Sequence, residues 1–253
     1  MKNTLTAAVI LIGNELLSGS IEDQNLAHIA KTLEVRGIRV RETRIIPDIE
    51  SDIIDAVNTL RAKHDYVFTT GGIGPTHDDI TSDSIAAAFG LPNVVQQEVF
   101  DSIAHYLKNK GVEFSSAAQR MAYAPEGAEI ISSGESIVSS YRIGNVFVMA
   151  GVPRIMRLML DGIVKQLQTG VEIHNAYVHA NVSEGEIAAP LEAIQNQHPN
   201  IDIGSYPQDI GSTISKYRVI FVVKGTDLIE ISSTCDEILQ ACAKGGYEAV
   251  RVE

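Results

Sequence analysis

Two periods of apolar spacing alternate along the first two thirds of the chain. Apolar, strand-like runs occupy residues 7–12, 38–46 and 66–70, and helical spacing of apolar residues fills 25–36 and 51–62 between them. Strands that alternate with helices in this way are typical of a mostly parallel sheet with helices on both faces. Ligands of such sheets bind beyond the carboxyl ends of the strands, so we expect a site in the loops that follow them.

The pattern continues with helices and short strands up to about residue 170. It predicts helices at 82–88, 97–110, 116–123 and 153–167, and strands at 128–132, 137–143 and 145–149. Pro153 suits the first turn of its helix, because its missing N–H would have no partner there in any case. These residues predict an α/β domain of three α/β/α layers with a mostly parallel sheet.

After residue 170 the pattern restarts in a different order. It predicts a strand, a helix, two strands, a helix and a strand, at 173–182, 184–197, 201–206, 215–224, 227–244 and 247–252. This βαββαβ order is typical of a smaller α+β, ferredoxin-like module. Ser183 and Glu186 form a Ser-x-x-Glu capping box, which supports the start of the first helix. We therefore predict two domains, residues 1–170 and 171–253.

Composition and charge narrow the classes of partner. The chain has 253 residues, 45% hydrophobic residues and a formal net charge of -12. General nucleic-acid binders and anionic-membrane binders need a basic surface, so both classes are excluded. The apolar run 7–12 is too short to span a membrane and lacks the form of a signal peptide. We expect a cytoplasmic protein.

The two cysteines, Cys235 and Cys242, fall in one predicted helix. This spacing separates them by about 10.5 Å along the helix axis, which exceeds the roughly 7 Å between Cα atoms that a disulfide can bridge. With neither a third thiol nor a nearby histidine, they form no zinc motif. We interpret them as small apolar residues that face the same side of the helix.

The stretch 69–81 has the sequence Thr-Thr-Gly-Gly-Ile-Gly-Pro-Thr-His-Asp-Asp-Ile-Thr and carries most of the recognisable chemistry. Its three glycines let the backbone approach a ligand closely, and amides that open a helix attract an anion. No Gly-Lys-Ser/Thr follows, which excludes the Walker phosphate loop, and the spacing differs from the dinucleotide fingerprint. The stretch predicts a phosphate cradle, although glycines at a strand-to-helix turn also serve geometry alone.

Two adjacent aspartates, Asp78 and Asp79, follow the glycines, and Asp48 ends the neighbouring strand. The attraction of a helix dipole for phosphate is small beside the repulsion from several carboxylates. Either a divalent cation bridges carboxylates and phosphate, or one aspartate is a general base. We favour the cation. The alternative is that Asp78 or Asp79 caps the following helix.

Three further loops, residues 13–19, 47–48 and 150–153, also follow predicted strands and should converge on the same rim. Glu15 is suited to bind a base, a pterin edge or a ribose hydroxyl, or to cap the following helix. Asp23 and Asn25 are interpreted as helix-start residues, and His77 as a ligand contact rather than a catalyst. The expected ligand and phosphate contacts are Gly13, Glu15, Ser18, Gly71, Gly72, Gly74, Pro75, Thr76, His77, Thr81, Gly151 and Pro153.

These motifs resemble those of the molybdopterin-binding fold family and, within it, the N-terminal part of the competence/damage-inducible protein A group. Residues 13–19, 71–81 and 150–153 resemble the first, central and third motifs of that group, and 183–188 and 203–207 resemble its smaller middle domain. The resemblance covers nearly the whole chain. The Gly-Gly-Ile-Gly-Pro-Thr-His-Asp-Asp form also resembles the pterin-fold domain of eukaryotic FAD synthases.

The resemblance implies two kinds of chemistry. The pterin-fold domain of FAD synthases hydrolyses FAD, and the competence-protein group is associated with metal-dependent hydrolysis of ADP-ribose. The MoaB/Mog-like molybdopterin adenylyltransferases instead join AMP to the pterin phosphate, with two important aspartates that match Asp48 and Asp79. Those transferases usually have Thr where this chain has Ile73, and they generally lack a domain like residues 171–253. Both departures favour hydrolysis.

We therefore predict metal-dependent hydrolysis of a nucleotide diphosphate linkage, as in ADP-ribose or FAD. Asp48 and Asp79 are the expected catalytic residues, and Asp78 and Asp79 the expected metal ligands. The expected cofactor is Mg²⁺, Mn²⁺, Co²⁺ or Ni²⁺, with K⁺ as a further candidate. The expected partners are a nucleotide or pterin phosphate and a second copy of the chain, in a homodimer. The alternatives are a molybdopterin adenylyltransferase and a non-catalytic nucleotide- or pterin-binding module.

Overall fold

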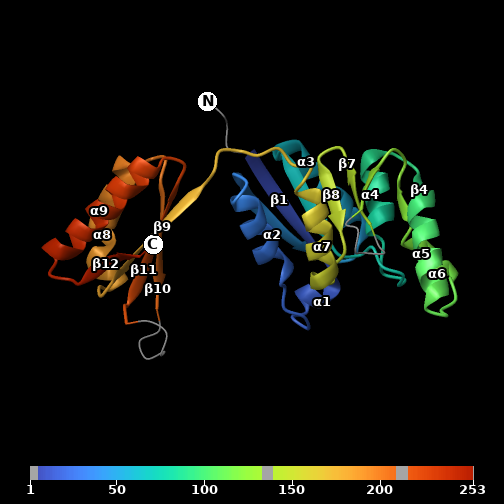
Figure 1. The fold of residues 1–253 in the computed structure, drawn as a ribbon, viewed down its shortest axis with the longest axis horizontal. Helices are drawn as coiled ribbons and strands as arrows, with labels where there is room; N and C mark the ends of the chain where they lie inside the picture. Colours follow the sequence, from blue (N-terminus) through green and yellow to red (C-terminus); the bar gives the residue numbers. More distant parts are fainter. Residues whose placement is uncertain (1–4, 133–138, 209–215, 253) are drawn as a thin grey trace. The chain divides into compact units, whose positions relative to one another are not determined.

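The computed structural model describes residues 5–132, 139–208 and 216–252 (Figure 1). The chain divides into two compact units, Met1–Gly170 and Val171–Glu253. Parts of two predicted strands, residues 137–138 of the run 137–143 and residue 215 of the run 215–224, lie outside the described residues.

The first unit is built on a mostly parallel sheet. In the described residues its strands run in the order β2-β1-β3-β8-β7-β6. Their bounds are β1 (Leu5–Ile12), β2 (Ile38–Ile46), β3 (Tyr66–Thr70), β6 (Glu129–Ile131), β7 (Ser140–Ile143) and β8 (Val146–Met149). Strands β2, β1, β3 and β8 are mutually parallel, and β7 and β6 add an antiparallel edge. The predicted α/β class is confirmed.

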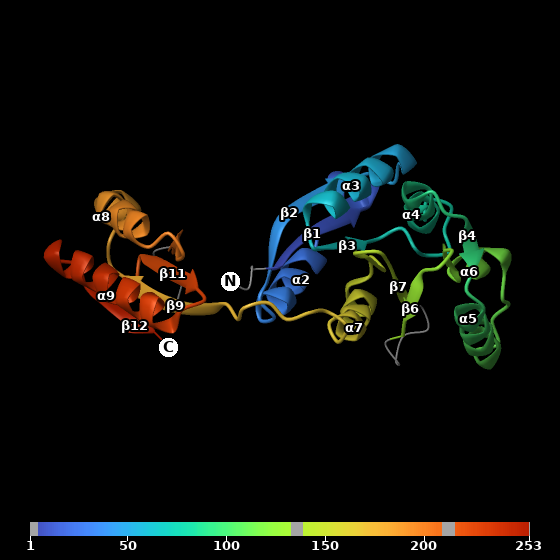
Figure 2. The ribbon, with the colours of Figure 1, turned by 90° about the horizontal axis from the view of Figure 1, so that it is seen from above.

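Helices cover both faces of this sheet, as the alternation of strands and helices predicts (Figure 2). The helices α2 (Asn25–Glu34) and α7 (Pro153–Ile163) pack on one face, and α3 (Glu50–Lys63) and α4 (Thr81–Phe89) pack on the other. Strand β1 lies between them, so Val9 and Leu11 belong to one core and Ala8 and Ile10 to the other. Alternate residues of a strand point to opposite faces, which accounts for its nearly unbroken apolar sequence.

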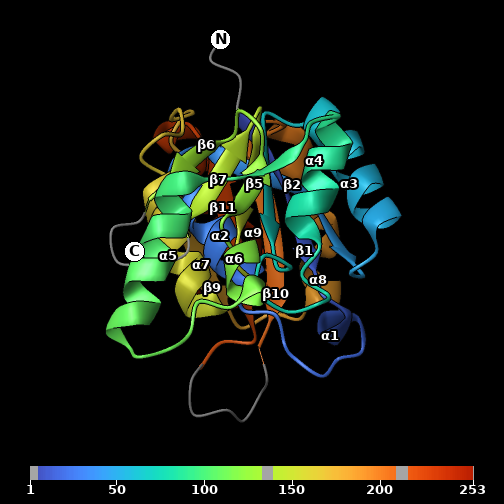
Figure 3. The same cartoon turned by 90° about the vertical axis from the view of Figure 1, so that its right-hand side faces the viewer.

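Between α4 and β6 the chain leaves the main sheet and forms a small excursion. It consists of β4 (Asn93–Val95), α5 (Gln97–Asn109), α6 (Ser116–Arg120) and β5 (Tyr123–Pro125), and Figure 3 shows α5 and α6 in front of the sheet. Strands β4 and β5 pair antiparallel. The sequence did not predict them, because three residues are too few for a strand period to be recognised. Val99, Ile103 and Ala122 form a separate small core here.

The second unit has the predicted βαββαβ order. Its elements are β9 (His174–Ala180), α8 (Glu184–Gln197), β10 (Asp202–Pro207), β11 (Val219–Gly225), α9 (Leu228–Lys244) and β12 (Ala249–Val252). The strands pair antiparallel in the order β10-β11-β9-β12, and both helices pack on one face. The prediction of a ferredoxin-like module is thus confirmed.

Local predictions for the second unit are also confirmed. The capping box is present, because the Ser183 side chain and the Glu186 side chain each bond the other residue's backbone N–H. Cys235 and Cys242 are free and buried in α9. Burial raises the pKa of both thiols, which keeps them protonated and unreactive at neutral pH. Within the described residues, no helix is long and apolar enough to cross a membrane.

Glu42 on β2 generates a prediction about acid stability. Its carboxylate accepts bonds from Lys63 at 2.5 Å and from Arg44 at 3.2 Å. The Lys63 bond above all, with help from Arg44, lowers the pKa of Glu42 from 4.5 to about 2. Because the folded pKa lies below the unfolded one, this stabilisation is complete above pH 4.5 and is lost as the pH falls toward 2.

We expect Glu42→Gln to lower the urea midpoint of unfolding at pH 7, with the difference from the native chain shrinking as the pH falls below 4.5. Glu113→Gln, at an exposed loop position of the same unit, is the control and should show no such convergence. A midpoint difference for Glu42→Gln that stays constant between pH 7 and pH 3 would contradict the assignment.

Candidate functional site

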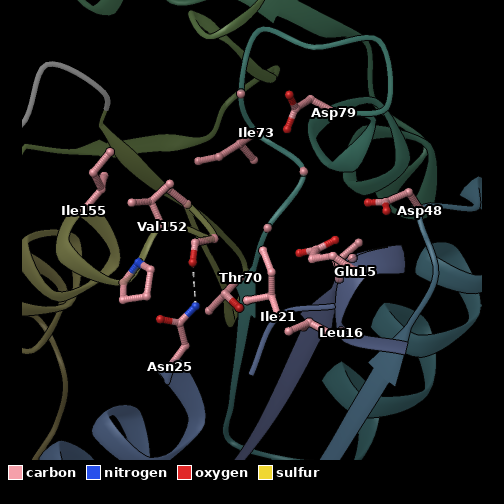
Figure 4. Close-up of a pocket in the computed structure, with 18 of the residues that line it drawn as sticks. Glu15, Leu16, Ile21, Asn25, Asp48, Thr70, Ile73, Asp79, Val152 and Ile155 are labelled. Atoms are coloured by element: carbon pink, nitrogen blue, oxygen red, sulfur yellow. Dashed lines mark hydrogen bonds between the residues drawn. The ribbon is translucent and has the colours of Figure 1, made fainter. Parts of the chain in front are cut away.

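A cavity of about 530 Å³ lies at the carboxyl ends of the parallel strands of the first unit (Figure 4). Its walls come from the loops that follow β1, β2, β3 and β8, together with the start of α2. Four loops that are far apart in the sequence meet here because parallel neighbours place their carboxyl ends at the same edge of a sheet. The structure therefore brings the predicted loops together at one cavity.

The turn after β3 depends on two glycines with positive φ angles. Gly71 has a φ of 104°, and a Cβ there would lie 2.1 Å from the Ile12 carbonyl oxygen. Gly72 has a φ of 68°, and a Cβ there would lie 2.1 Å from Thr81 Oγ1. Any side chain would therefore clash at either position. A residue other than glycine would also be destabilised by the left-handed backbone conformation. Thr81 completes the turn, since its Oγ1 donates to the Gly71 carbonyl at 2.9 Å.

These glycines do not open a helix, which corrects one step of the sequence argument. Helix α4 begins only at Thr81, and residues 75–80 separate it from the glycine turn. Proline at position 75 has no N–H to donate and fixes its own φ, so the chain turns again before the helix starts. An anion at this turn would meet the backbone amides of the turn itself rather than the start of α4.

The two aspartates of the motif are held by a tight turn. Asp79 Oδ2 accepts the Thr76 N–H at 2.7 Å and lies 2.5 Å from Thr76 Oγ1. Asp78 Oδ1 also lies 2.5 Å from that hydroxyl, and the hydrogen bond lowers the pKa of Asp78. A single hydroxyl proton can satisfy only one of these oxygens at a time. The two carboxylates are therefore crowded around one donor, and both line the cavity.

The interpretation of Asp78 or Asp79 as a helix cap is wrong. The residue before α4 is Ile80, and no side chain makes a capping bond there. Capping was expected because aspartate is a common N-cap residue. In this chain the Asp79 carboxylate turns back to Thr76 instead.

Asp48 joins the loop after β2 to the loop after β1. Its Oδ2 accepts the Asn14 N–H at 2.9 Å, and the Gly13 N–H bonds the Ile46 carbonyl at 3.1 Å. The Glu15 carboxylate folds over Gly13, where a Cβ would lie 2.4 Å from its Oε1. The short helix α1 (Asn14–Leu17) has no side-chain cap, so the interpretation of Glu15 as a cap is wrong. Both carboxylates line the cavity.

The start of α2 forms the opposite wall. Asp23 accepts the Asn25 and Leu26 N–H groups at 3.1 and 3.0 Å, which confirms it as a helix-start residue. The Asn25 side chain instead donates to the Gly151 carbonyl at 2.8 Å and so ties α2 to the loop after β8 (Figure 4). Asn25 is buried, and its Oδ1 has no hydrogen-bond partner among the described residues.

Three of the residues predicted to contact the ligand do not line this cavity. Ser18 Oγ bonds Ser20, the His77 side chain is 97% exposed, and Thr81 is buried behind the glycine turn. The other expected contacts do line it: Gly13, Glu15, Gly71, Gly72, Gly74, Pro75, Thr76, Gly151 and Pro153. Pro153 occupies the predicted first turn of α7.

The aliphatic side chains in the cavity lining were not anticipated. Leu16, Ile21, Val152 and Ile155 line it beside Ile73 (Figure 4). Ile21 and Val152 are 58% and 57% exposed although they face a cavity. The sequence contains one indication of this lining, because these aliphatic residues are isolated inside otherwise polar loops. The cavity thus combines the glycine turn and carboxylates with aliphatic side chains that suit a flat ring.

The charged side chains among the described residues that line the cavity are all acidic. Six carboxylates line it, from Glu15, Glu22, Asp23, Asp48, Asp78 and Asp79, and within the described residues no lysine, arginine or histidine does. No group of three or more histidine, cysteine, aspartate or glutamate residues in that part of the chain is arranged to hold a metal ion alone. A cation here would need oxygens from a ligand or from water to complete its coordination.

The glycine turn generates a prediction about stability. We expect Gly72→Ala to lower the free energy of unfolding by about 1–3 kcal/mol more than Gly90→Ala. Gly90 is the matched control, because its φ of 67° is nearly the same but nothing lies within 4 Å of a Cβ there. Urea unfolding of both variants measures the difference. Equal losses would show that the contact with Thr81 does not restrict this position.

Comparison with known proteins supports the fold and the family. A protein of Archaeoglobus fulgidus is 34% identical over 79% of this chain and 85% of its own length. A CinA-like protein of Desulfosudis oleivorans is 34% identical over 65% of this chain, but only 41% of that longer protein is matched. The solved structure of the protein CinA, of unknown function, from Thermoplasma acidophilum has a TM-score of 0.58 at 27% identity, covering 64% of this chain and 96% of that one.

Two family models match, one in each unit. The model described as FAD synthase, middle domain, matches residues 172–250. The model described as probable molybdopterin binding domain matches residues 8–169, which contain the whole cavity. Because this second match spans more than half of the chain, the protein belongs to the family of probable molybdopterin binding domains.

Proposed function

We propose that this protein hydrolyses the diphosphate linkage of a nucleotide, such as ADP-ribose or FAD, with the help of a divalent cation. The proposal rests mainly on the charge of the cavity lining, which is entirely negative. Six carboxylates line the cavity, and no basic side chain is among the described lining residues. A diphosphate would be repelled from such a cavity unless a cation entered with it. Pterin phosphates face the same constraint.

Asp78 and Asp79 are the residues that would hold the cation. Their oxygens are crowded around one hydroxyl, and a divalent ion would offset the repulsion between them. The pKa of Asp78 is lowered by its bond from Thr76, so its carboxylate is ionised at neutral pH. Mg²⁺ typically takes one or two carboxylates and completes its shell with phosphate oxygens and water, so the donor set fits Mg²⁺, Mn²⁺, Co²⁺ or Ni²⁺. The bound ion would lower the pKa of water and offset charge on the phosphates.

The protein's own groups would bind the substrate and direct the attack. The backbone at Gly72 and Gly74 lines the cavity without a side chain to block close approach of the diphosphate. Asp48 uses Oδ2 to hold the Asn14 N–H, and in the described structure its Oδ1 has no hydrogen-bond partner. Asp48 would accept a proton from the attacking water, which adds to one phosphorus while the bond to the bridging oxygen breaks.

The aliphatic side chains of the lining would pack against the flat ring of the nucleotide. Ile21 and Val152 expose aliphatic surface toward a cavity large enough for such a ring. The match of the second unit to the middle domain of FAD synthase favours a flavin or adenine nucleotide as the substrate to test first.

Adenylylation of molybdopterin is the second candidate. It is favoured by the description of the family to which residues 8–169 belong, a probable molybdopterin binding domain. Formation of adenylylated pterin from molybdopterin, ATP and Mg²⁺ would establish it in place of hydrolysis. Binding of nucleotide or pterin without turnover across all metals would instead show a non-catalytic module.

The hydrolysis proposal predicts that Asp79→Asn abolishes turnover. A panel of ADP-ribose, FAD, NADH and ATP with Mg²⁺, Mn²⁺, Co²⁺ or Ni²⁺, with and without K⁺, would be followed by release of the mononucleotide. Loss of the Asp79 charge should lower kcat by at least about a hundredfold, as loss of a metal-holding or proton-transferring group does. Asp101→Asn on α5 is the control and should retain activity. Full metal-dependent hydrolysis by Asp79→Asn would refute the assignment.

The proposal also predicts that metal and nucleotide bind together. Because the described residues offer no complete metal site, Mn²⁺ should bind weakly to the protein alone and at least about tenfold more tightly when a methylene-bridged ADP-ribose analogue, which cannot be hydrolysed at the bridge, supplies phosphate oxygens. Electron paramagnetic resonance of free Mn²⁺ measures both affinities. Equal affinity with and without nucleotide would contradict a shared site.

A further inference from the structure

Arg120 connects the excursion to the aspartate turn. It is the last residue of α6, 41 positions along the chain from Asp79. Its guanidinium donates to the Asp79 carbonyl at 2.9 Å and to the Thr76 carbonyl at 3.3 Å. The Asp83 carboxylate lies 3.9 Å away. One planar side chain thus spans the two ends of the turn that carries Asp78 and Asp79.

The rest of the turn is exposed and bonds mainly to itself. Residues 75–78 are exposed, and a cavity of about 110 Å³ lies among Gly72, Gly74, Tyr123 and Arg120. The bonds inside the turn, such as the 3.3 Å bond from the Asp79 N–H to the Thr76 carbonyl, join near neighbours only. Beyond Asp79 the chain is tied to the glycines, because the Thr81 N–H and Thr81 Oγ1 donate to the Gly72 and Gly71 carbonyls, each at 2.9 Å. Arg120 adds a second, long-range support, directly at Thr76 and Asp79.

Arg120 does not line the main cavity, so its effect on chemistry there passes through the backbone it holds. We infer that Arg120 is a positioning residue, which keeps the Asp78 and Asp79 carboxylates directed at the metal and diphosphate. The inference rests on the proposed function. Its chemical basis is the rigid fork of the guanidinium, which binds two carbonyls at once, whereas a lysine ammonium cannot match this geometry.

The positive charge of Arg120 contributes to the same effect. It bonds two backbone carbonyls of a turn that also carries two carboxylates, and it lies 3.9 Å from the Asp83 carboxylate. A guanidinium stays charged at all working pH values, so it offsets part of the repulsion among these acids when no metal is bound. The turn is therefore held in place before the ligands arrive.

The test compares Arg120→Ala with Arg61→Ala and Arg120→Lys in the full chain. Arg61 is the matched control, because it too donates to a distant carbonyl, that of Ala88 at 3.1 Å, but near the C-terminal end of α4, and it does not line the cavity. Three measurements are made on each variant. They are kcat and KM for ADP-ribose, the Mn²⁺ affinity in the presence of a methylene-bridged ADP-ribose analogue, and hydrogen exchange of the peptide 72–81.

We expect Arg120→Ala to lower kcat by about tenfold to a hundredfold, the effect of misplacing a reacting group by about 1 Å. It should weaken Mn²⁺ binding at least about fivefold and speed exchange in 72–81, with little change in KM. Arg120→Lys should stay close to Arg120→Ala, and guanidinium ion at concentrations that do not unfold the protein should restore part of the activity of Arg120→Ala. Arg61→Ala should lose stability without any of these changes.

The outcomes separate this inference from the proposed function. If the native chain is active and Arg120→Ala behaves like Arg61→Ala in Mn²⁺ affinity and exchange, Arg120 has no positioning role and the hydrolase proposal stands. If the native chain neither turns over any substrate nor binds Mn²⁺ with the analogue, the proposed function fails and the inference fails with it. A change in metal affinity confined to the Arg120 variants supports both.

Discussion

The pairing of β1 with a parallel strand on each side is the constraint on which the rest of the first unit depends. Residues Ala7 to Ile12 are buried, so β1 can only form in the centre of the sheet with helices on both faces. Its end at Ile12 then meets the turn after β3 so closely that only glycine fits at position 71. The same end brings Gly13 against the loop after β2 and hence against Asp48. The cavity therefore follows from the pairing of β1 with its two neighbouring strands.

Charge gives the cavity its chemical character. The chain as a whole has a formal charge of -12, and the described lining of the cavity carries six carboxylates without a basic side chain. Such a lining is unfavourable for any anion alone and favourable for an anion that arrives with a cation. The backbone amides of the glycine turn provide neutral donors beside these acids. Cation, phosphate and protein would therefore be mutually dependent in binding, as in sites where metal and phosphate share ligands.

The excursion between α4 and β6 gives the turn a support from outside the main sheet. It has its own small core around Val99 and Ile103, so its position does not depend on the exposed turn itself. From it, Met121 lines the cavity while Arg120 reaches the carbonyls behind the aspartates. Two adjacent residues of the excursion thus contribute to the lining of the cavity and to the support of the backbone that carries the aspartates.

The sequence by itself determined the alternating strands and helices of the main sheet, the ferredoxin-like second unit and the convergence of four loops, but not the short strands β4 and β5. The determined features follow from apolar periodicity and from parallel pairing. The roles of some single residues could also be predicted from their sequence neighbours. Examples are Asp23 at the start of its helix and the capping box at Ser183. Only the tertiary structure decided that Asp79 turns back to Thr76 instead of capping α4, that Ile21 and Val152 face the cavity, and that Arg120 holds the turn. The positions of Ile21, Val152 and Arg120 depend on contacts with residues distant in sequence. The bond of Asp79 depends on which of two local hydrogen bonds forms. A local sequence pattern specifies neither.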